Sequence, residues 1–88
     1  MNRKSDAELE VLLADASQEI RVNGRYVHFR NGNAYIVEKL VIDERTDGVA
    51  VVYHRDGKPN IPYVRPAASW LETKLFGTER VPRFRLVE

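Results

Sequence analysis

Hydrophobic and polar positions follow two different patterns along this chain, and the pattern changes near residue 22. Between Leu9 and Ile20 the apolar residues recur three and four positions apart, which places them on one stripe of a helix. The preceding Ser5-Asp6-Ala7-Glu8 has the form of a capping box, which is a common helix start. The pattern therefore predicts an amphipathic helix within residues 1–22.

After residue 22 the apolar positions alternate with polar ones, and strands are expected over 25–30, 34–42, 49–53 and 61–65. The prolines around the last of these restrict it to a sheet edge. A helical turn is expected over 67–71, and the segments 73–76 and 83–87 are expected to pair with each other. Tight turns are predicted at four dipeptides whose residues tolerate positive φ: Asn23-Gly24, Asn31-Gly32, Asp47-Gly48 and Asp56-Gly57.

These elements together predict a mainly β fold. Five or six short strands with tight turns in residues 23–88 are typical of a small SH3-like half-open barrel. Residues 1–22 would precede it as an acidic amphipathic helix. A chain of 88 residues fits one domain with one modest core.

Cysteine content and hydropathy limit where the protein works. The chain contains no cysteine, so disulfides and the thiolate sites of structural zinc or iron–sulfur clusters are excluded. Its longest nearly apolar run, over 49–53, is far shorter than the roughly 20 residues of a membrane span. The first residues lead into no apolar signal segment. We therefore expect a cytoplasmic protein that has no membrane partner.

The net charge of +1 conceals an asymmetry between the predicted helix and the rest of the chain. Residues 5–20 carry five acids and no base, whereas residues 21–88 carry 12 bases against eight acids. This basic excess permits a polyanionic partner but does not require one, because an ordinary solvated surface has a similar composition.

Patterns typical of catalysis or metal binding are scarce. His28 and His54 are the only histidines, and no carboxylate lies at metal-ligand spacing from them. The three serines stand at a helix cap, within a helix and beside Trp70, and no glycine-rich phosphate loop is present. No metal, cofactor or nucleophilic site is therefore predicted, and His28 taken alone is interpreted as a strand residue that hydrogen-bonds a neighbouring strand.

Aromatic and arginine side chains form the set with a functional interpretation. Stacking on an aromatic ring, combined with guanidinium contacts to phosphate, is how small barrels bind single-stranded nucleic acid. The same rings are also the largest core-filling groups, and Tyr35 and Trp70 are assigned to the core. Arg65 and Arg83 are interpreted as contacts or as structural clamps, with Glu72 as a partner for Arg65. The candidate binding residues are Tyr26, His28, Tyr53, Arg55, Tyr63, Arg65 and Arg83.

The order of short motifs across this β-rich part resembles a known family. It is similar to a small bacterial and phage family catalogued as domain of unknown function 1653, over Gly24 to Arg85. Tyr63 stands where that family commonly has Trp, and Trp70 stands where it commonly has Phe. The resemblance implies a small domain without an established reaction, and it assigns no catalytic residue. The motifs are Tyr26-x-His28-Phe29-x-x-Gly32, Tyr35, Val51-Val52-Tyr53, Val64-Arg65-Pro66 and Val81-Pro82-Arg83-Phe84.

Three functions follow, in order of preference. The first is a small non-enzymatic binding module that contacts nucleic acid or protein through the Tyr/His/Arg set, with nucleic acid favoured by the basic charge. The second is an interaction or regulatory adaptor whose helix docks on a partner through Leu9, Leu12, Leu13 and Ala16. The third and least favoured is an enzyme using Tyr26, His28 and Arg65, because no activated pair can be identified. The pattern does not indicate an oligomeric state.

Overall fold

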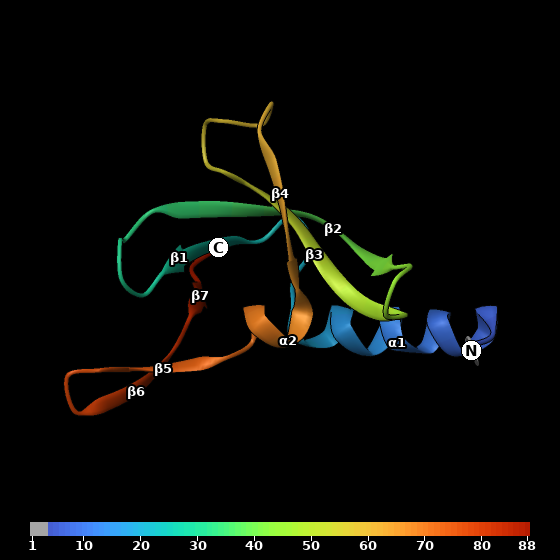
Figure 1. Cartoon of the computed structure of the whole chain (residues 1–88). Helices are drawn as coiled ribbons and strands as arrows, with labels where there is room; N and C mark the ends of the chain where they lie inside the picture. The colour runs from blue at the N-terminus through green and yellow to red at the C-terminus, as the bar shows by residue number, and fades with distance from the viewer. Residues whose placement is uncertain (1–3) are drawn as a thin grey trace.

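The computed structural model describes residues 4–88 and contains two helices and seven strands in that range. Five strands form one antiparallel sheet in the order β4-β3-β2-β1-β7, and β5 and β6 form a separate hairpin. Figure 1 shows the bent sheet above α1, with the hairpin at the lower left. The elements are α1 (Asp6–Glu19), β1 (Arg25–His28), β2 (Ala34–Asp43), β3 (Gly48–Arg55), β4 (Pro62–Pro66), α2 (Ala67–Trp70), β5 (Thr73–Phe76), β6 (Glu79–Pro82) and β7 (Phe84–Leu86).

This arrangement confirms the mainly β fold with one N-terminal helix. The open five-stranded sheet is consistent with a half-open barrel, although the described residues form seven strands where five or six were expected. The segment around Tyr63 forms the edge strand β4, as its prolines predicted. Neither helix in residues 4–88 is long and apolar enough to cross a membrane.

The helix α1 begins with the predicted capping box. The Ser5 hydroxyl accepts a hydrogen bond from the Glu8 amide at 3.2 Å, and the Ser5 amide donates to the Glu8 carboxylate at 2.9 Å. These two hydrogen bonds hold the pKa of Glu8 below its ordinary value. The helix then packs along β2 and β3, where Ala16 and Ile20 are buried. The apolar stripe of α1 therefore lies on the protein's own sheet.

Each predicted turn dipeptide contains one residue with positive φ. These residues are Asn23 at 69°, Gly32 at 72°, Asp47 at 56° and Gly57 at 87°. The last three lie in the connections β1–β2, β2–β3 and β3–β4, whereas Asn23 lies between α1 and β1. The turn predictions are confirmed at all four positions.

A β-bulge in β2 determines which side chains reach the core. Val37 pairs with Tyr53, the register then shifts, and Leu40 pairs with Val51. Cross-strand partners point to the same side of a sheet, so Val37 and Leu40 face one side although they are three positions apart. We call this side the inner face. Its core cluster consists of Ile20, Tyr26, Val37, Val51, Tyr53, Ala67, Trp70 and Phe84.

The predicted pairing of 73–76 with 83–87 is wrong. Phe76 pairs with Glu79, so residues 77 and 78 form a two-residue turn in which Gly77 has a φ of 68°. The tight turn folds β6 back onto β5 and leaves Phe84 and its neighbours free of the hairpin. These residues form β7, which pairs with β1 at the edge of the main sheet.

Candidate functional site

The strand register brings six of the seven candidate binding residues to the inner face. Tyr26 pairs with Tyr35, which also pairs with Arg55, and His28 pairs with Phe84. On the other side of β3, Tyr63 pairs with Tyr53 and Arg65 pairs with Val51. Alternation along each strand then places all of these side chains on one side of the sheet. Arg83, the seventh, immediately precedes β7.

Two of the candidate residues, Tyr26 and Tyr53, lie in the core. The Tyr26 hydroxyl accepts a hydrogen bond from the Arg21 amide at 2.8 Å, and the Tyr53 ring packs at 4.9 Å from that of Trp70. Because both side chains are buried, neither offers a ring face for stacking with a ligand. Trp70 is buried as expected, whereas Tyr35 is only half-buried against the core.

The Phe84 ring lies beside a histidine and an arginine, and a second arginine precedes it in the chain. This ring stacks on Trp70 at 3.8 Å with an interplanar angle of 7°. The Arg65 guanidinium lies 5.6 Å from the Phe84 ring centre, and the His28 ring contacts it edge-on at 5.1 Å. The charge of Arg83 also acts on His28. We call His28, Arg65 and Arg83 the cationic cluster.

Glu72 approaches Arg83 and not Arg65, so the expected Arg65–Glu72 pair is wrong. Arg65 donates instead to the Ser69 hydroxyl at 2.9 Å, because α2 presents Ser69 four residues after Arg65. Glu72 hydrogen-bonds Lys74 at 3.0 Å and reaches Arg83 only at 3.7 Å. The Lys74 contact is the main cause, and Arg83 a lesser one, of a lowered pKa for Glu72.

The two arginines of the cationic cluster have buried donors without an acceptor. Among residues 4–88, the Nε atoms of Arg65 and Arg83 are the buried side-chain nitrogen or oxygen atoms that have no hydrogen-bond partner. Only 17% of the Arg83 side chain is exposed. An unsatisfied buried donor costs about 1–3 kcal/mol, and more on a charged group. Each Nε–H would therefore gain from an acceptor, whether an ordered water or a ligand oxygen.

His28 contributes a hydrogen-bond donor to the same place. Its Nδ1 accepts a hydrogen bond from the Arg30 amide at 3.2 Å, so the proton of the neutral ring is assigned to Nε2. Burial, followed by the charges of Arg83, Arg65 and Arg30, holds the pKa of His28 below its ordinary value. The ring is therefore neutral near pH 7 and sits in a positive field, where an anion would be attracted.

Tyr63 and Arg55 extend this surface along the edge of the sheet. Tyr63 is 45% exposed, and its ring lies 5.8 Å from that of Tyr53. A pocket of about 240 Å³ beside it is lined by Arg55, Lys58, Ile61 and Tyr63. An accessible ring flanked by basic side chains on both sides is the arrangement that stacking and phosphate contact require.

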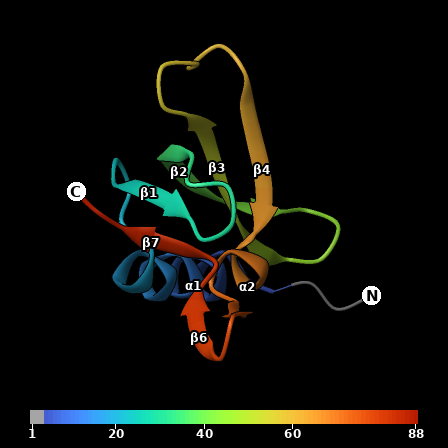
Figure 2. The same ribbon diagram turned by 90° about the vertical axis from the view of Figure 1, so that its left-hand side faces the viewer.

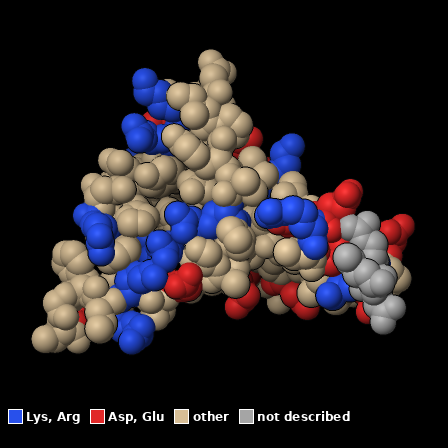
Figure 3. All heavy atoms as spheres, in the orientation of Figure 1, with Lys and Arg blue, Asp and Glu red and all other residues tan. Residues whose placement is uncertain are grey.

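Opposite charges occupy different regions of the molecular surface. In the view of Figure 3, many Lys and Arg atoms gather at the centre and left, whereas most of the visible acidic atoms lie at the lower right. Figure 1 places α1 in that acidic region. The sequence asymmetry between an acidic helix and a basic sheet is thus a spatial asymmetry as well.

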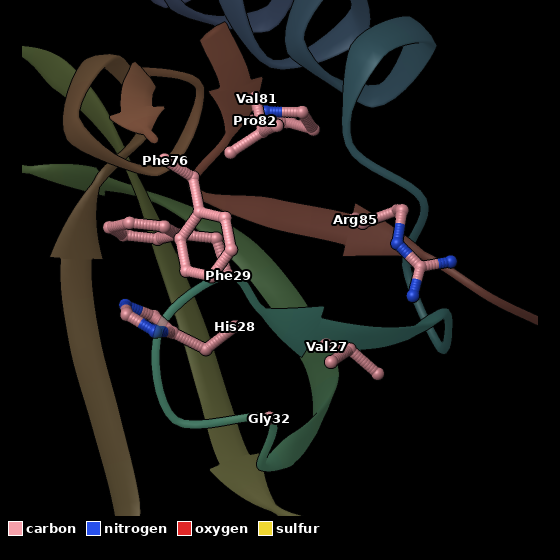
Figure 4. A pocket seen from close by; sticks show the side chains of 8 residues that line it. All are labelled: Val27, His28, Phe29, Gly32, Phe76, Val81, Pro82 and Arg85. Carbon is pink, nitrogen blue, oxygen red and sulfur yellow. The ribbon is translucent and has the colours of Figure 1, made fainter. Parts of the chain in front are cut away.

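A second pocket lies between β1, β7 and the β5–β6 hairpin and has a volume of about 280 Å³. We call it the hairpin pocket. Figure 2 shows the hairpin extending away from the main sheet, and Figure 4 shows the pocket from close by. His28 also lines it, so the pocket adjoins the cationic cluster. Its other side chains are mostly apolar: Val27, Phe29, Phe76, Val81, Pro82 and Arg85.

A histidine–carboxylate pair lies on the opposite side of the sheet. The bulge places Glu38 beside His54, whose Nδ1 is 2.6 Å from the Glu38 Oε2. No group of three or more potential metal-ligating side chains occurs in residues 4–88. We assign the Glu38–His54 pair to the structure of β2 and β3.

Several residues of these two sites were not expected from the sequence. Ser69 and Phe84 organise Arg65, and Phe29, Phe76 and Arg85 form the hairpin pocket. The two-residue turn at Gly77-Thr78 was the available signal for the hairpin, because it fixes where β6 begins. The position of Phe84 depends on the return of the chain to β1, for which no local pattern exists.

Comparisons with known proteins agree on one family. A family described as "Protein of unknown function (DUF1653)" matches residues 24–86. A crystal structure of a protein belonging to this family from Bordetella bronchiseptica is 31% identical and superposes with a TM-score of 0.65. The similarity covers 80% of this chain and 90% of that one. No match was found among curated proteins.

Proposed function

Because the chain belongs to the DUF1653 family of proteins of unknown function, we propose that it is a small binding module for oxyanions. In this proposal the ligand is the phosphate of a single-stranded nucleic acid, held on the inner face. The observation that supports it most directly is the pair of buried, unpartnered Nε donors on Arg65 and Arg83. The charges of both arginines act on His28, and guanidinium N–H donors match the geometry of phosphate oxygens.

The proposed contacts follow from what each group can donate. Arg65 and Arg83 provide charged N–H groups, and His28 provides Nε2–H. Tyr63 lies two residues before Arg65 on the same side of β4, roughly 7 Å away along the strand. A base stacked on Tyr63 would therefore bring its phosphate near the cationic cluster, with Arg55 adding charge on the far side of the ring.

The alternatives have less support. The stripe of α1 that an adaptor would present to a partner packs on β2 and β3, with Ala16 buried. For an enzyme, Tyr26 would have to act as an acid or base, yet its hydroxyl is engaged by the Arg21 amide within the core. As part of the proposal we assign the binding role to the cytoplasm, because a chain without cysteine suits a reducing compartment.

Binding of labelled single-stranded oligonucleotides at several salt concentrations tests the proposal. We expect measurable affinity at low salt that falls as salt rises, because phosphate contacts release counterions. Arg65→Gln and Arg83→Gln should each weaken binding and reduce the slope of log K against log salt by about one. Arg45→Gln is the matched control, because Arg45 lies in the β2–β3 connection and pairs with Asp43.

A parallel titration with inorganic phosphate, followed through the NMR signals of His28, separates the two parts of the proposal. If phosphate shifts these signals but no oligonucleotide binds, the oxyanion site is supported and nucleic acid is rejected as the ligand that supplies the phosphate. If neither ligand acts, or if Arg45→Gln weakens binding as much as Arg65→Gln, the proposal is wrong. Thermal unfolding of each variant confirms that the binding changes arise from a folded protein.

A further inference from the structure

We propose that the hairpin pocket is a second binding site, which accepts a small aromatic carboxylate. The ring of the ligand would lie among Phe29, Phe76 and Pro82, and its carboxylate would contact Arg85. Small-molecule sites combine apolar walls with a few polar groups that orient the ligand. The hairpin pocket has this composition, and its apolar walls suit an aromatic carboxylate and not the nucleic-acid phosphate proposed for the cationic cluster.

The apolar wall comes from two segments that are far apart in the sequence. Phe29 follows β1 directly, and Phe76 ends β5 on the hairpin. Their rings approach edge to face at 6.4 Å, yet 61% of Phe76 stays exposed. In Figure 4 the two rings lie on one side of the pocket, with Val81 and Pro82 above them. An aromatic ring placed here would cover apolar surface that water otherwise contacts.

Arg85 forms the charged end of the hairpin pocket. In Figure 4 its side chain lies on the side of the pocket opposite the two phenyl rings. The Arg85 guanidinium makes no ion pair or hydrogen bond with another residue in the described range 4–88. None of the residues lining the pocket is acidic, and Arg30 places a further positive charge over the Phe29 ring at 5.6 Å. These charges favour a carboxylate over a neutral or cationic group.

The size of the pocket limits the ligand to a single ring with a short acid chain. Its volume of about 280 Å³ lies just below the roughly 300–1,000 Å³ of typical small-molecule sites. A nucleotide or polymer would not be enclosed. The inference does not depend on the proposed nucleic-acid contact, because the two sites share only His28.

Titration of the full-length protein with 3-phenylpropionate, followed by amide NMR shifts, tests this site. The neutral analogue 3-phenylpropanol is the ligand control. Arg85→Gln and Phe76→Ala are the test variants. Leu75→Ala and Arg80→Gln are their matched controls, because Leu75 pairs with Arg80 and both alternate to the other side of the hairpin from Phe76.

We expect saturable shifts at Phe29, Phe76 and Arg85 for the acid and weaker shifts for the alcohol. Arg85→Gln should weaken the acid about fivefold without changing the affinity for the alcohol, since it removes only the charge contact. Phe76→Ala should weaken both ligands, and the two control variants should change neither. The proposal is overturned by the absence of saturable shifts at millimolar ligand. Equal binding of acid and alcohol, or sensitivity to Arg65→Gln without sensitivity to Arg85→Gln, would also overturn it.

Discussion

Arg65 and Arg83 are placed by aromatic packing and by neutral or distant partners, and not by close ion pairs. Arg65 has a hydroxyl, Ser69, as its hydrogen-bond acceptor and the Phe84 ring beneath its guanidinium. Within residues 4–88, the carboxylate near Arg83 is that of Glu72, at 3.7 Å. A close bidentate carboxylate would have occupied the same N–H groups and neutralised the charge. At the scale of single residues, the two guanidinium groups are therefore held in place, but no close carboxylate in the described residues neutralises their charge.

The burial of His28, together with the positive charges around it, leads to a prediction about pH. Because the pKa of His28 is lowered in the folded state, the unfolded chain takes up a proton first as the pH falls. Stability should therefore decrease as the pH falls below about 6.5, the ordinary pKa of histidine. His28→Gln should remove this part of the pH dependence, measured as the difference in urea midpoint between neutral and mildly acidic buffer. An identical pH dependence in the variant would show that His28 is not the group responsible for it.

At the scale of elements, the bulge at Glu38 determines which side chains of β2 face the core and which face the opposite side of the sheet. It turns both Val37 and Leu40 toward the core, and it sets Glu38 beside His54 on the other side. A regular strand could not do this, because side chains three positions apart would point to opposite sides.

Deleting Glu38 should therefore leave a regular strand. Val37 would still pair with Tyr53, and Lys39 with Val52, so Val37 and Leu40 would lie two positions apart on the inner face, and we expect cooperative unfolding to persist. Glu38→Ala keeps the register and should cost about 1 kcal/mol, which corresponds to the lost hydrogen bond with His54. Circular dichroism during urea unfolding measures both variants. Loss of cooperative unfolding in the deletion variant alone would show that β2 needs the bulge itself and not only the pairings on either side of it.

At the scale of the whole molecule, α1 is part of the folding unit although it precedes the family match. Ile20, which directly follows the helix, is completely buried in the core cluster with Tyr26 and Trp70. The helix also covers the part of the inner face that β2 and β3 present. The sheet alone would expose this apolar surface.

Ile20→Ala should therefore destabilise the protein by about 2–5 kcal/mol, the usual cost of a cavity at a fully buried isoleucine. Val11→Ala is the control in the same segment, because Val11 is 58% exposed, and it should change stability by less than about 0.5 kcal/mol. Thermal or urea unfolding measures both. Equal effects of the two substitutions would indicate that α1 is not packed on the core.

Local patterns predicted most of the elements, and non-local contacts account for what they missed. The capping box, the positive-φ dipeptides and the proline-bounded edge strand are each determined by a few neighbouring residues. The inner-face position of His28 and Arg65 follows from strand alternation, so it could be predicted from the sequence. The burial of Tyr26 and Tyr53 could not be predicted, because the same aromatic residue suits a core or a binding surface. The return of Phe84 to β1, which assembles the cationic cluster, joins segments more than fifty residues apart.

The β5–β6 hairpin closes on itself at its base. Thr73 pairs with Pro82, and just outside that pair the Arg83 amide donates to the Glu72 carbonyl at 2.8 Å, so the chain leaves and re-enters the domain at nearly the same point. The loop at Gly77-Thr78 can therefore be lengthened without changing any pairing in the main sheet. This makes the hairpin tip a suitable place to graft a foreign epitope or a fluorescent reporter while the scaffold keeps its shape.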